Sequence, residues 1–107
     1  MSVSIEDFEK LDIRIGKVLE AERIEGYKKI IKLKVDVGDK ELEIIAGGAQ
    51  FYEPKYFIER TVVVLVNLEP KTVAGVKSTG MLLAADLNGK PLWLTIDQEA
   101  PPGTKVR

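Results

Sequence analysis

The sequence contains no cysteine and no histidine. Disulfides, zinc–thiolate sites and thiol nucleophiles are therefore excluded, and so are imidazole bases and the commonest ligand of transition metals. There is also no apolar run near the ~18 residues of a membrane span, and no basic N-terminal segment followed by an apolar signal core. We therefore expect a soluble, cytoplasmic protein that holds no metal or cofactor and is a binding protein rather than an enzyme.

Neither sign of charge is in clear excess. The 107 residues carry 16 lysines and arginines against 17 aspartates and glutamates, which gives a formal net charge of -1. The chain as a whole therefore has no electrostatic attraction for nucleic acid, and any such binding must come from local clustering. A chain of this length supports one core, and we expect residues 1–107 to form a single domain.

Apolar residues recur with the period of two that is typical of half-buried strands. The clearest case is the segment 31–37, where four apolar residues alternate with polar ones that include Lys32 and Lys34. A glycine-containing turn at 38–40 leads into a second alternating run at 42–46, so the two segments are expected to form an antiparallel hairpin.

Two further elements are expected before this hairpin. Alternation over 11–21 predicts a long strand, and Gly16 marks a bend or bulge in it. Ser4 is in a position to cap a short helix over residues 4–11, and we expect this helix to act as a lid or plug of the fold.

The second half of the chain supplies the remaining strands of a barrel. The run 62–68 is apolar at nearly every position, as in a strand buried on both faces, and 78–85 reads as a fifth strand. The connector 51–60 contains Pro54 and is expected to be irregular or briefly helical. Its aromatic residues are expected to cap the core: Tyr52, Tyr56 and Phe57. Five strands with one connector predict an all-β, five-stranded OB-type barrel over residues 1–86.

Residues 87–107 are expected to form a C-terminal β extension. An asparagine-glycine turn leads into an apolar strand over 91–96. Leu92 and Leu94 fall on one face of this strand and Trp93 on the other, so both faces need covering. We expect the extension to join two copies into a homodimer, with Leu92, Trp93 and Leu94 at the interface. For Trp93, a plain core position is an equally good interpretation.

Three segments resemble the tRNA-binding OB-fold family. Residues 67–85 read NLEPKTVAGVKSTGMLLAA, residues 7–17 read DFEKLDIRIGK, and residues 29–38 read KIIKLKVDVG. The family includes the C-terminal appendage or separate small subunit of methionyl-tRNA synthetase, free-standing tRNA-binding proteins and a bacterial export-chaperone branch. The three motifs follow one another in the family's order and together cover nearly the whole chain.

The resemblance implies a non-catalytic, homodimeric module that recognises the folded shape of tRNA and acts alone or with methionyl-tRNA synthetase. OB folds bind nucleic acid on the face of their second and third strands and on two flanking loops. Here these regions contain cations that are able to contact phosphate and donors that flank the second loop. The candidate tRNA-binding residues are Lys28, Lys29, Lys32, Lys34, Asn67, Lys71, Lys77 and Ser78, with Tyr27 as a candidate for base stacking.

Each candidate also has an architectural interpretation. Lys32 and Lys34 fit a solvated sheet face, where lysine protects against edge pairing. Asn67 and Ser78 are equally suited to hydrogen-bond the backbone of the loop between them. Tyr27 is at least as well suited to pack on the end of the barrel.

The sequence departs from the tRNA-binding pattern in both loops. In the first loop only Lys29 and Ile30 fit the family motif, and in the second Glu69, Thr72 and Ala74 stand where many members are basic. These departures predict a weaker affinity for phosphate. The segments 74–78, 8–14 and 97–105 are instead similar to the export chaperones. The alternative function is therefore binding of polypeptides in a groove of the dimer.

Overall fold

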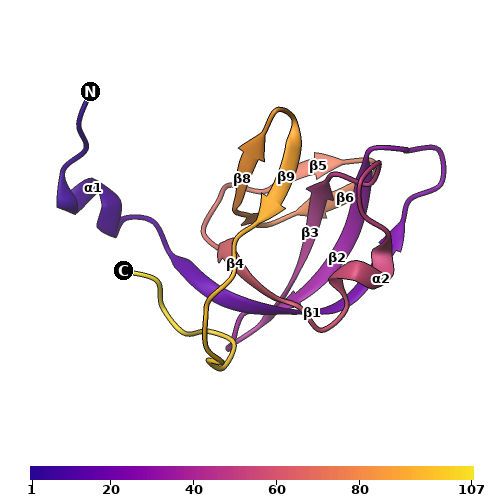
Figure 1. The fold of residues 1–107 in the computed structure, drawn as a ribbon. Coiled ribbons are helices and arrows are strands. Elements are labelled where there is room, and N and C mark those ends of the chain that lie inside the picture. Colours follow the sequence, from indigo (N-terminus) through magenta and orange to yellow (C-terminus); the bar gives the residue numbers. More distant parts are fainter.

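The computed structural model describes all residues 1–107 (Figure 1). Its largest element is an antiparallel sheet of five strands in the order β3-β2-β1-β4-β7. The backbone N–H of Thr79 donates to the Glu43 carbonyl at 3.1 Å, which brings the start of β7 beside β3 and nearly closes the barrel. The predicted OB-type barrel is thus confirmed. Its strands are β1 (Ile13–Arg23), β2 (Ile30–Asp36), β3 (Glu41–Gly47), β4 (Thr61–Leu65) and β7 (Met81–Leu82).

The hairpin of β2 and β3 is confirmed, with Ile31, Leu33 and Val35 buried inside the barrel. The bulge in β1 lies elsewhere than predicted, because the register with β2 shifts between Val18 and Glu20 rather than at Gly16. Gly16 has a packing role instead. A Cβ there would lie 2.7 Å from Val35 Cγ1 and 3.0 Å from Val64 Cγ2, so the close approach of β1 to β2 and β4 requires glycine.

The connector between β3 and β4 forms a short helix, α2 (Pro54–Phe57), as the sequence indicated. Phe57 is fully buried, and Tyr52 and Tyr56 pack against the same core. The prediction that these aromatics cap the barrel is therefore confirmed.

The predicted single strand at 78–85 is wrong. The chain instead forms three short strands with different partners. Val76–Ser78 pairs with the preceding segment Lys71–Val73, Met81–Leu82 pairs with β4, and Ala84–Leu87 pairs with the following segment Lys90–Trp93. Ala74 and Gly75, with φ of 53° and 78°, form the turn of the first hairpin, which occupies the predicted loop 69–77. The hairpins consist of β5 (Lys71–Val73) with β6 (Val76–Ser78), and β8 (Ala84–Leu87) with β9 (Lys90–Trp93).

Strand β4 is buried on both faces, as its unbroken apolar sequence predicted. Val62 and Val64 face the barrel core, whereas Val63 and Leu65 belong to a smaller cluster outside it. Residues of the C-terminal segment, including Ile96 and Val106, cover that outer cluster. The tail is also hydrogen-bonded along β1, with Val106 N–H donating to the Ile13 carbonyl at 2.9 Å.

The two faces of β9 have different environments. Trp93 packs on the barrel core, with its ring centroid 5.5 Å from that of Phe57 and 6.1 Å from that of Tyr52. Leu92 and Leu94 point the other way and are exposed. Trp93 therefore serves the core of its own chain, whereas Leu92 of β9 and Leu94, just beyond the end of β9, are left uncovered.

The N-terminal helix α1 (Ile5–Glu9) begins at the predicted cap, where Ser4 Oγ accepts a hydrogen bond from Asp7 N–H at 3.1 Å. The expectation that it is a lid or plug is wrong. None of its residues is buried, and Figure 1 shows the helix projecting away from the barrel. Its apolar residues Ile5 and Phe8 remain exposed, and they line a shallow hollow together with the C-terminal residues 105–107. Neither α1 nor α2 has the length and apolar character needed to cross a membrane.

Candidate nucleic-acid interface

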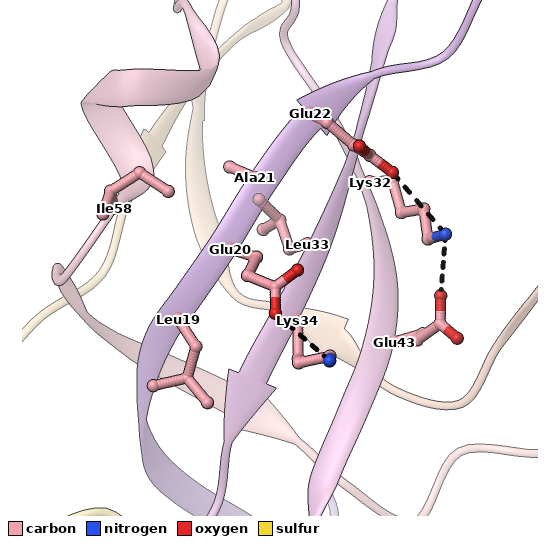
Figure 2. Close-up of a pocket in the computed structure, with 9 residues that line it drawn as sticks. All are labelled: Leu19, Glu20, Ala21, Glu22, Lys32, Leu33, Lys34, Glu43 and Ile58. Carbon is pink, nitrogen blue, oxygen red and sulfur yellow. Dashed lines mark ion pairs between the residues drawn. The ribbon is translucent and has the colours of Figure 1, made fainter.

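The outward face of β2 carries two of the candidate lysines, and both are paired with glutamates (Figure 2). Lys32 Nζ lies 3.2 Å from a Glu43 carboxylate oxygen and 3.7 Å from one of Glu22. Lys34 Nζ lies 3.2 Å from a carboxylate oxygen of Glu20. The cause is register, since β2 lies between two strands that present glutamates on the same face.

This pairing changes the electrostatics of the face. The neighbouring carboxylates raise the pKa of Lys32, mainly through Glu43, and the pKa of Lys34, mainly through Glu20. The shallow hollow of about 410 Å³ at this place is lined by three glutamates and only two lysines. A phosphate approaching the face therefore meets more negative than positive charge. The arrangement favours the interpretation of Lys32 and Lys34 as part of a solvated sheet face.

Lys28 and Lys29 differ from these lysines, because neither has an ion-pair partner. They lie in the loop between β1 and β2, and the Lys29 carbonyl accepts a hydrogen bond from Ala49 N–H at 3.2 Å. Tyr27 in the same loop is 49% exposed. Tyr27 and Lys28 line a hollow of about 340 Å³ together with Arg23 and one acidic residue, Glu25, which forms no ion pair with them. Tyr27 is thus only partly packed on the barrel.

Two further cations reach the same end of the barrel, and sequence reasoning did not find them. Arg23 Nη1 donates to the Ala49 carbonyl at 3.3 Å, which ties the end of β1 to the turn after β3. Tyr52 Oη donates to the Pro91 carbonyl at 2.7 Å, which brings hairpin β8–β9 to that turn. Lys90 beside Pro91 places its Nζ 5.8 Å from the Tyr52 ring centroid. We call Arg23, Lys28, Lys29 and Lys90 the cationic rim.

Nothing in the spacing of the sequence signals that these four residues meet. They come from the end of β1, the loop that follows it, and a hairpin about sixty residues further along. Arg23 is the one with a signal of its own, because it extends the alternation of β1 beyond the predicted end at residue 21.

Lys71 and Lys77 lie in hairpin β5–β6, and both are exposed without an ion-pair partner. Lys71 is directly opposite Ser78, and Lys77 is directly opposite Thr72. Successive residues of a strand point to opposite faces, so the two lysines emerge from opposite faces of the hairpin. The structure therefore does not bring them together into one patch.

Asn67 and Ser78 have clear architectural contacts. Asn67 Oδ1 accepts from Asp12 N–H at 2.9 Å, and its Nδ2 donates to the Lys10 carbonyl at 2.7 Å. Ser78 Oγ accepts from Ile45 N–H at 3.1 Å and so joins β6 to β3. Asn67 also lies beside the start of β1, whereas the cationic rim lies at its far end, an 11-residue strand away.

The start of β1 carries a separate charge cluster. Arg14 donates two hydrogen bonds to the Asp12 carboxylate, at 3.0 and 2.8 Å, and one to Asp39 at 2.7 Å. Lys105 Nζ lies 3.1 Å from Asp12 Oδ1. The hydrogen bonds from Arg14 are the main reason that the pKa of Asp12 falls to about 2. Every cation in this cluster has an acidic partner, and the ion pair of Lys105 with Asp12 fastens the C-terminal tail to the start of β1.

The fold and the cationic rim together define a small OB-fold binding module. Residues 13–105 match the family described as "Putative tRNA binding domain", and the chain belongs to that family. It is 51% identical over 104 residues to the methionine–tRNA ligase of Archaeoglobus fulgidus, covering 97% of this chain and 16% of the relative. For the methionine–tRNA ligase of Thermotoga maritima the identity is 42% over 105 residues, covering 98% and 17%. The chain thus spans about a sixth of the length of these relatives.

Solved structures of similar length support the same assignment. The MetRS related protein from Pyrococcus horikoshii superposes with a TM-score of 0.94 at 35% identity, covering 100% of this chain and 99% of that chain. The chaperone CsaA from Bacillus anthracis superposes with a TM-score of 0.90 at 34% identity, and each chain is covered completely. The resemblance to the tRNA-binding family and its chaperone branch is therefore confirmed.

Proposed function

We propose that this chain is a non-catalytic module that binds folded tRNA through its phosphates. The observation that supports this most is the cationic rim, where Arg23, Lys28, Lys29 and Lys90 gather from separate segments and none has an acidic partner. Unpaired cations are the groups that phosphates attract most strongly, because no carboxylate has to be displaced. Membership of the tRNA-binding family supports tRNA as the nucleic acid that is bound.

Recognition by shape follows from the chemistry of the rim. Lysine and arginine contacts to phosphate position a protein on its nucleic acid but carry no base sequence. Each phosphate that the rim neutralises releases counterions, so the affinity falls as the salt concentration rises. The module thus adds affinity for tRNA without choosing among tRNAs by their base sequence.

We propose that the module works in the cytoplasm as a stand-alone protein or as an accessory of methionyl-tRNA synthetase. The methionine–tRNA ligases that resemble it are several times longer, and the chain corresponds to a small part of each. An accessory module increases the hold of a catalytic partner on a shared substrate by raising its effective concentration.

We also propose that two copies associate through β9 and helix α1. Leu92 is exposed on β9 and Leu94 just beyond its end, and Ile5 and Phe8 are exposed on α1. Changing Leu92 and Leu94 to lysine together is expected to halve the mass measured by sedimentation at low micromolar concentration. Trp93→Ala is compared with the leucine variant, because it is expected to lower the melting temperature through loss of core packing instead of acting at the interface. A dimer that persists in the leucine variant contradicts the β9 interface.

The tRNA proposal is tested by titrating the purified protein with unfractionated tRNA and with a duplex RNA of matched length. The titrations are made at about 50 mM and about 200 mM salt, a range over which phosphate contacts lose affinity steeply. Saturable binding that prefers tRNA and weakens with salt is expected. Absence of binding at the lower salt concentration contradicts the proposal.

A second candidate function is binding of polypeptides, and the similarity to the chaperone CsaA favours it. A peptide held in an apolar groove gives binding with little salt dependence, because few counterions are released. An unfolded polypeptide added to the titration described above therefore separates the two functions. Salt-independent binding of the polypeptide, with no binding of tRNA, supports the second.

A further inference from the structure

Phe51 has an unusual position among the aromatic residues that follow β3. Tyr52 and Phe57 pack into the barrel core, whereas Phe51 as a residue is 45% exposed. No other aromatic residue packs on it within the chain, and the aromatic contacts of this region join only its buried neighbours. One aromatic face is thus presented to solvent at the end of the barrel.

The backbone beneath Phe51 is firmly held. Phe51 N–H donates to the Gly48 carbonyl at 2.8 Å, and Tyr52 N–H donates to the same carbonyl at 3.0 Å. Gly48 has a φ of 87°, so the tight turn depends on a residue without a Cβ. Ala49 is buried and is hydrogen-bonded to Lys29 and Arg23 of the cationic rim. The ring therefore stands on a fixed turn, which limits the entropy lost when a ligand stacks on it.

Two cations without an acidic partner, Lys90 and Arg23, lie close to the turn that carries Phe51. Lys90 Nζ lies 6.0 Å from the centroid of the Phe51 ring. Arg23 and Lys29 are joined through Ala49 to the same turn. An exposed aromatic face beside free cations is the combination that holds a nucleotide, with the base stacked on the ring and the phosphate near the cations.

We propose that Phe51 is a stacking platform for an unpaired base of tRNA, and that Lys90 contacts the adjoining phosphate. The inference rests on the proposed function and adds a contact that the phosphate-binding rim does not provide. Paired bases of an RNA helix are stacked on one another and are not available, so the platform takes a base from a loop or an end. It thereby gives the module a preference for folded tRNA over a regular duplex.

The test compares three changes with matched exposure. Phe51→Ala removes the ring, and Phe51→Tyr keeps an aromatic face. Ile58→Ala is the control, because Ile58 is also an exposed apolar residue, at 40%, but lines the hollow on the sheet face. The melting temperature of each variant is measured first, and all three are expected to match the parent because the altered side chains are exposed.

Affinities are then measured for tRNA and for a fully paired RNA duplex. Loss of one base–aromatic stack weakens binding by about fivefold to about 100-fold, and this is expected for Phe51→Ala with tRNA only. Phe51→Tyr and Ile58→Ala are expected to bind tRNA as the parent does. Phe51→Trp adds a direct readout, since a base stacked on the new indole quenches its fluorescence above the background of Trp93.

Two results overturn the inference while leaving tRNA binding intact. One is a Phe51→Ala variant that binds tRNA as tightly as the parent, and the other is equal weakening for tRNA and duplex. Quenching of the Phe51→Trp variant by an apolar peptide, but not by a short single-stranded oligonucleotide, also overturns it. If the parent protein binds no tRNA at all, the proposed function fails together with this inference.

Discussion

The lysines between residues 28 and 34 divide into two groups that the structure treats in opposite ways. Lys32 and Lys34 lie on the outward face of β2 and are paired with glutamates of β1 and β3. Lys28 and Lys29 lie in the preceding loop and have no acidic partner. The difference shows that the availability of a charge depends on what its strand neighbours carry, and not on how many lysines are close in sequence.

The physical reason is the geometry of the sheet. Directly opposed residues on neighbouring strands have their Cβ atoms only about 5 Å apart. Strand pairing alone therefore brings glutamates of β1 and β3 within ion-pair distance of a lysine on β2. A loop residue has no fixed cross-strand neighbour, and its charge remains available to a ligand. The cationic rim is therefore the expected phosphate surface, and the sheet face is not.

The largest effect is expected from reversing the charge of the rim. Lys28→Glu combined with Lys29→Glu replaces attraction by repulsion at two positions, and we expect tRNA affinity at low salt to fall by about 100-fold. A filter-binding titration measures this. Lys10→Glu combined with Lys40→Glu is the matched control, because it changes the net charge equally at residues outside the rim. Equal loss in both variants would mean that overall charge, and not the rim, determines binding.

Hairpin β5–β6 is expected to have a smaller role. Lys71→Ala and Lys77→Ala each remove one unpaired cation and are expected to weaken tRNA binding by about fivefold, with no change in melting temperature. Because the two lysines lie on opposite faces of the hairpin, the two losses also show whether tRNA contacts both faces. Unchanged affinity in both variants removes the hairpin from the interface.

Removing the glutamate partners of Lys32 is expected to make its charge available to tRNA. Glu22→Gln combined with Glu43→Gln removes both partners of Lys32 while keeping the shape of the side chains. We expect tRNA affinity to rise by about threefold, since a newly available cation adds one weak contact. Glu6→Gln combined with Glu9→Gln changes the net charge equally on helix α1 and is the control. No difference between the two variants contradicts the pairing argument.

The charge cluster at the start of β1 is expected to affect stability and not binding. The pKa of the Asp12 carboxyl is lowered from its ordinary value of 3.8 to about 2 in the folded protein, so folding favours the charged carboxylate. Its contribution is therefore complete above about pH 4 and is lost as the pH falls toward 2. Allowing for partial exposure, this loss is about 1 to 2 kcal/mol.

Urea unfolding across this pH range measures that contribution. The Asp12→Asn variant is expected to show a flatter dependence of the unfolding free energy on pH than the parent. Its affinity for tRNA at neutral pH is expected to be unchanged, because the cluster lies at the other end of β1 from the cationic rim. A pH dependence equal to that of the parent contradicts the assigned role of Asp12.

Much of the fold follows from local pattern. The alternation around Leu33 predicts β2, and the unbroken apolar run around Val63 predicts a strand covered on both faces, because each pattern reflects burial directly. The three short strands after Lys71 were missed, since their pairing depends on which hairpin each one joins. The exposed position of α1 was missed as well, because Ile5 and Phe8 indicate a buried face without saying what buries it.

The candidate site was less predictable than the fold. The sequence predicted Lys28 and Lys29 as phosphate-binding residues, but it predicted Lys32 equally, because the glutamate partners of Lys32 lie on other strands. Arg23 and Lys90 join the rim only through the turn at Ala49 and the contact of Tyr52 with Pro91. Such contacts between distant segments have no local signature, so the composition of the rim required the structure.

The salt dependence of tRNA binding tests the central claim most directly. It is measured as the slope of log affinity against log salt for the parent and for two alanine variants, Lys28→Ala with Lys29→Ala and Lys32→Ala with Lys34→Ala. We predict that the rim variant lowers the slope by about one to two, and that the sheet-face variant leaves it unchanged. A sheet-face variant that lowers the slope as much as the rim variant would contradict the account.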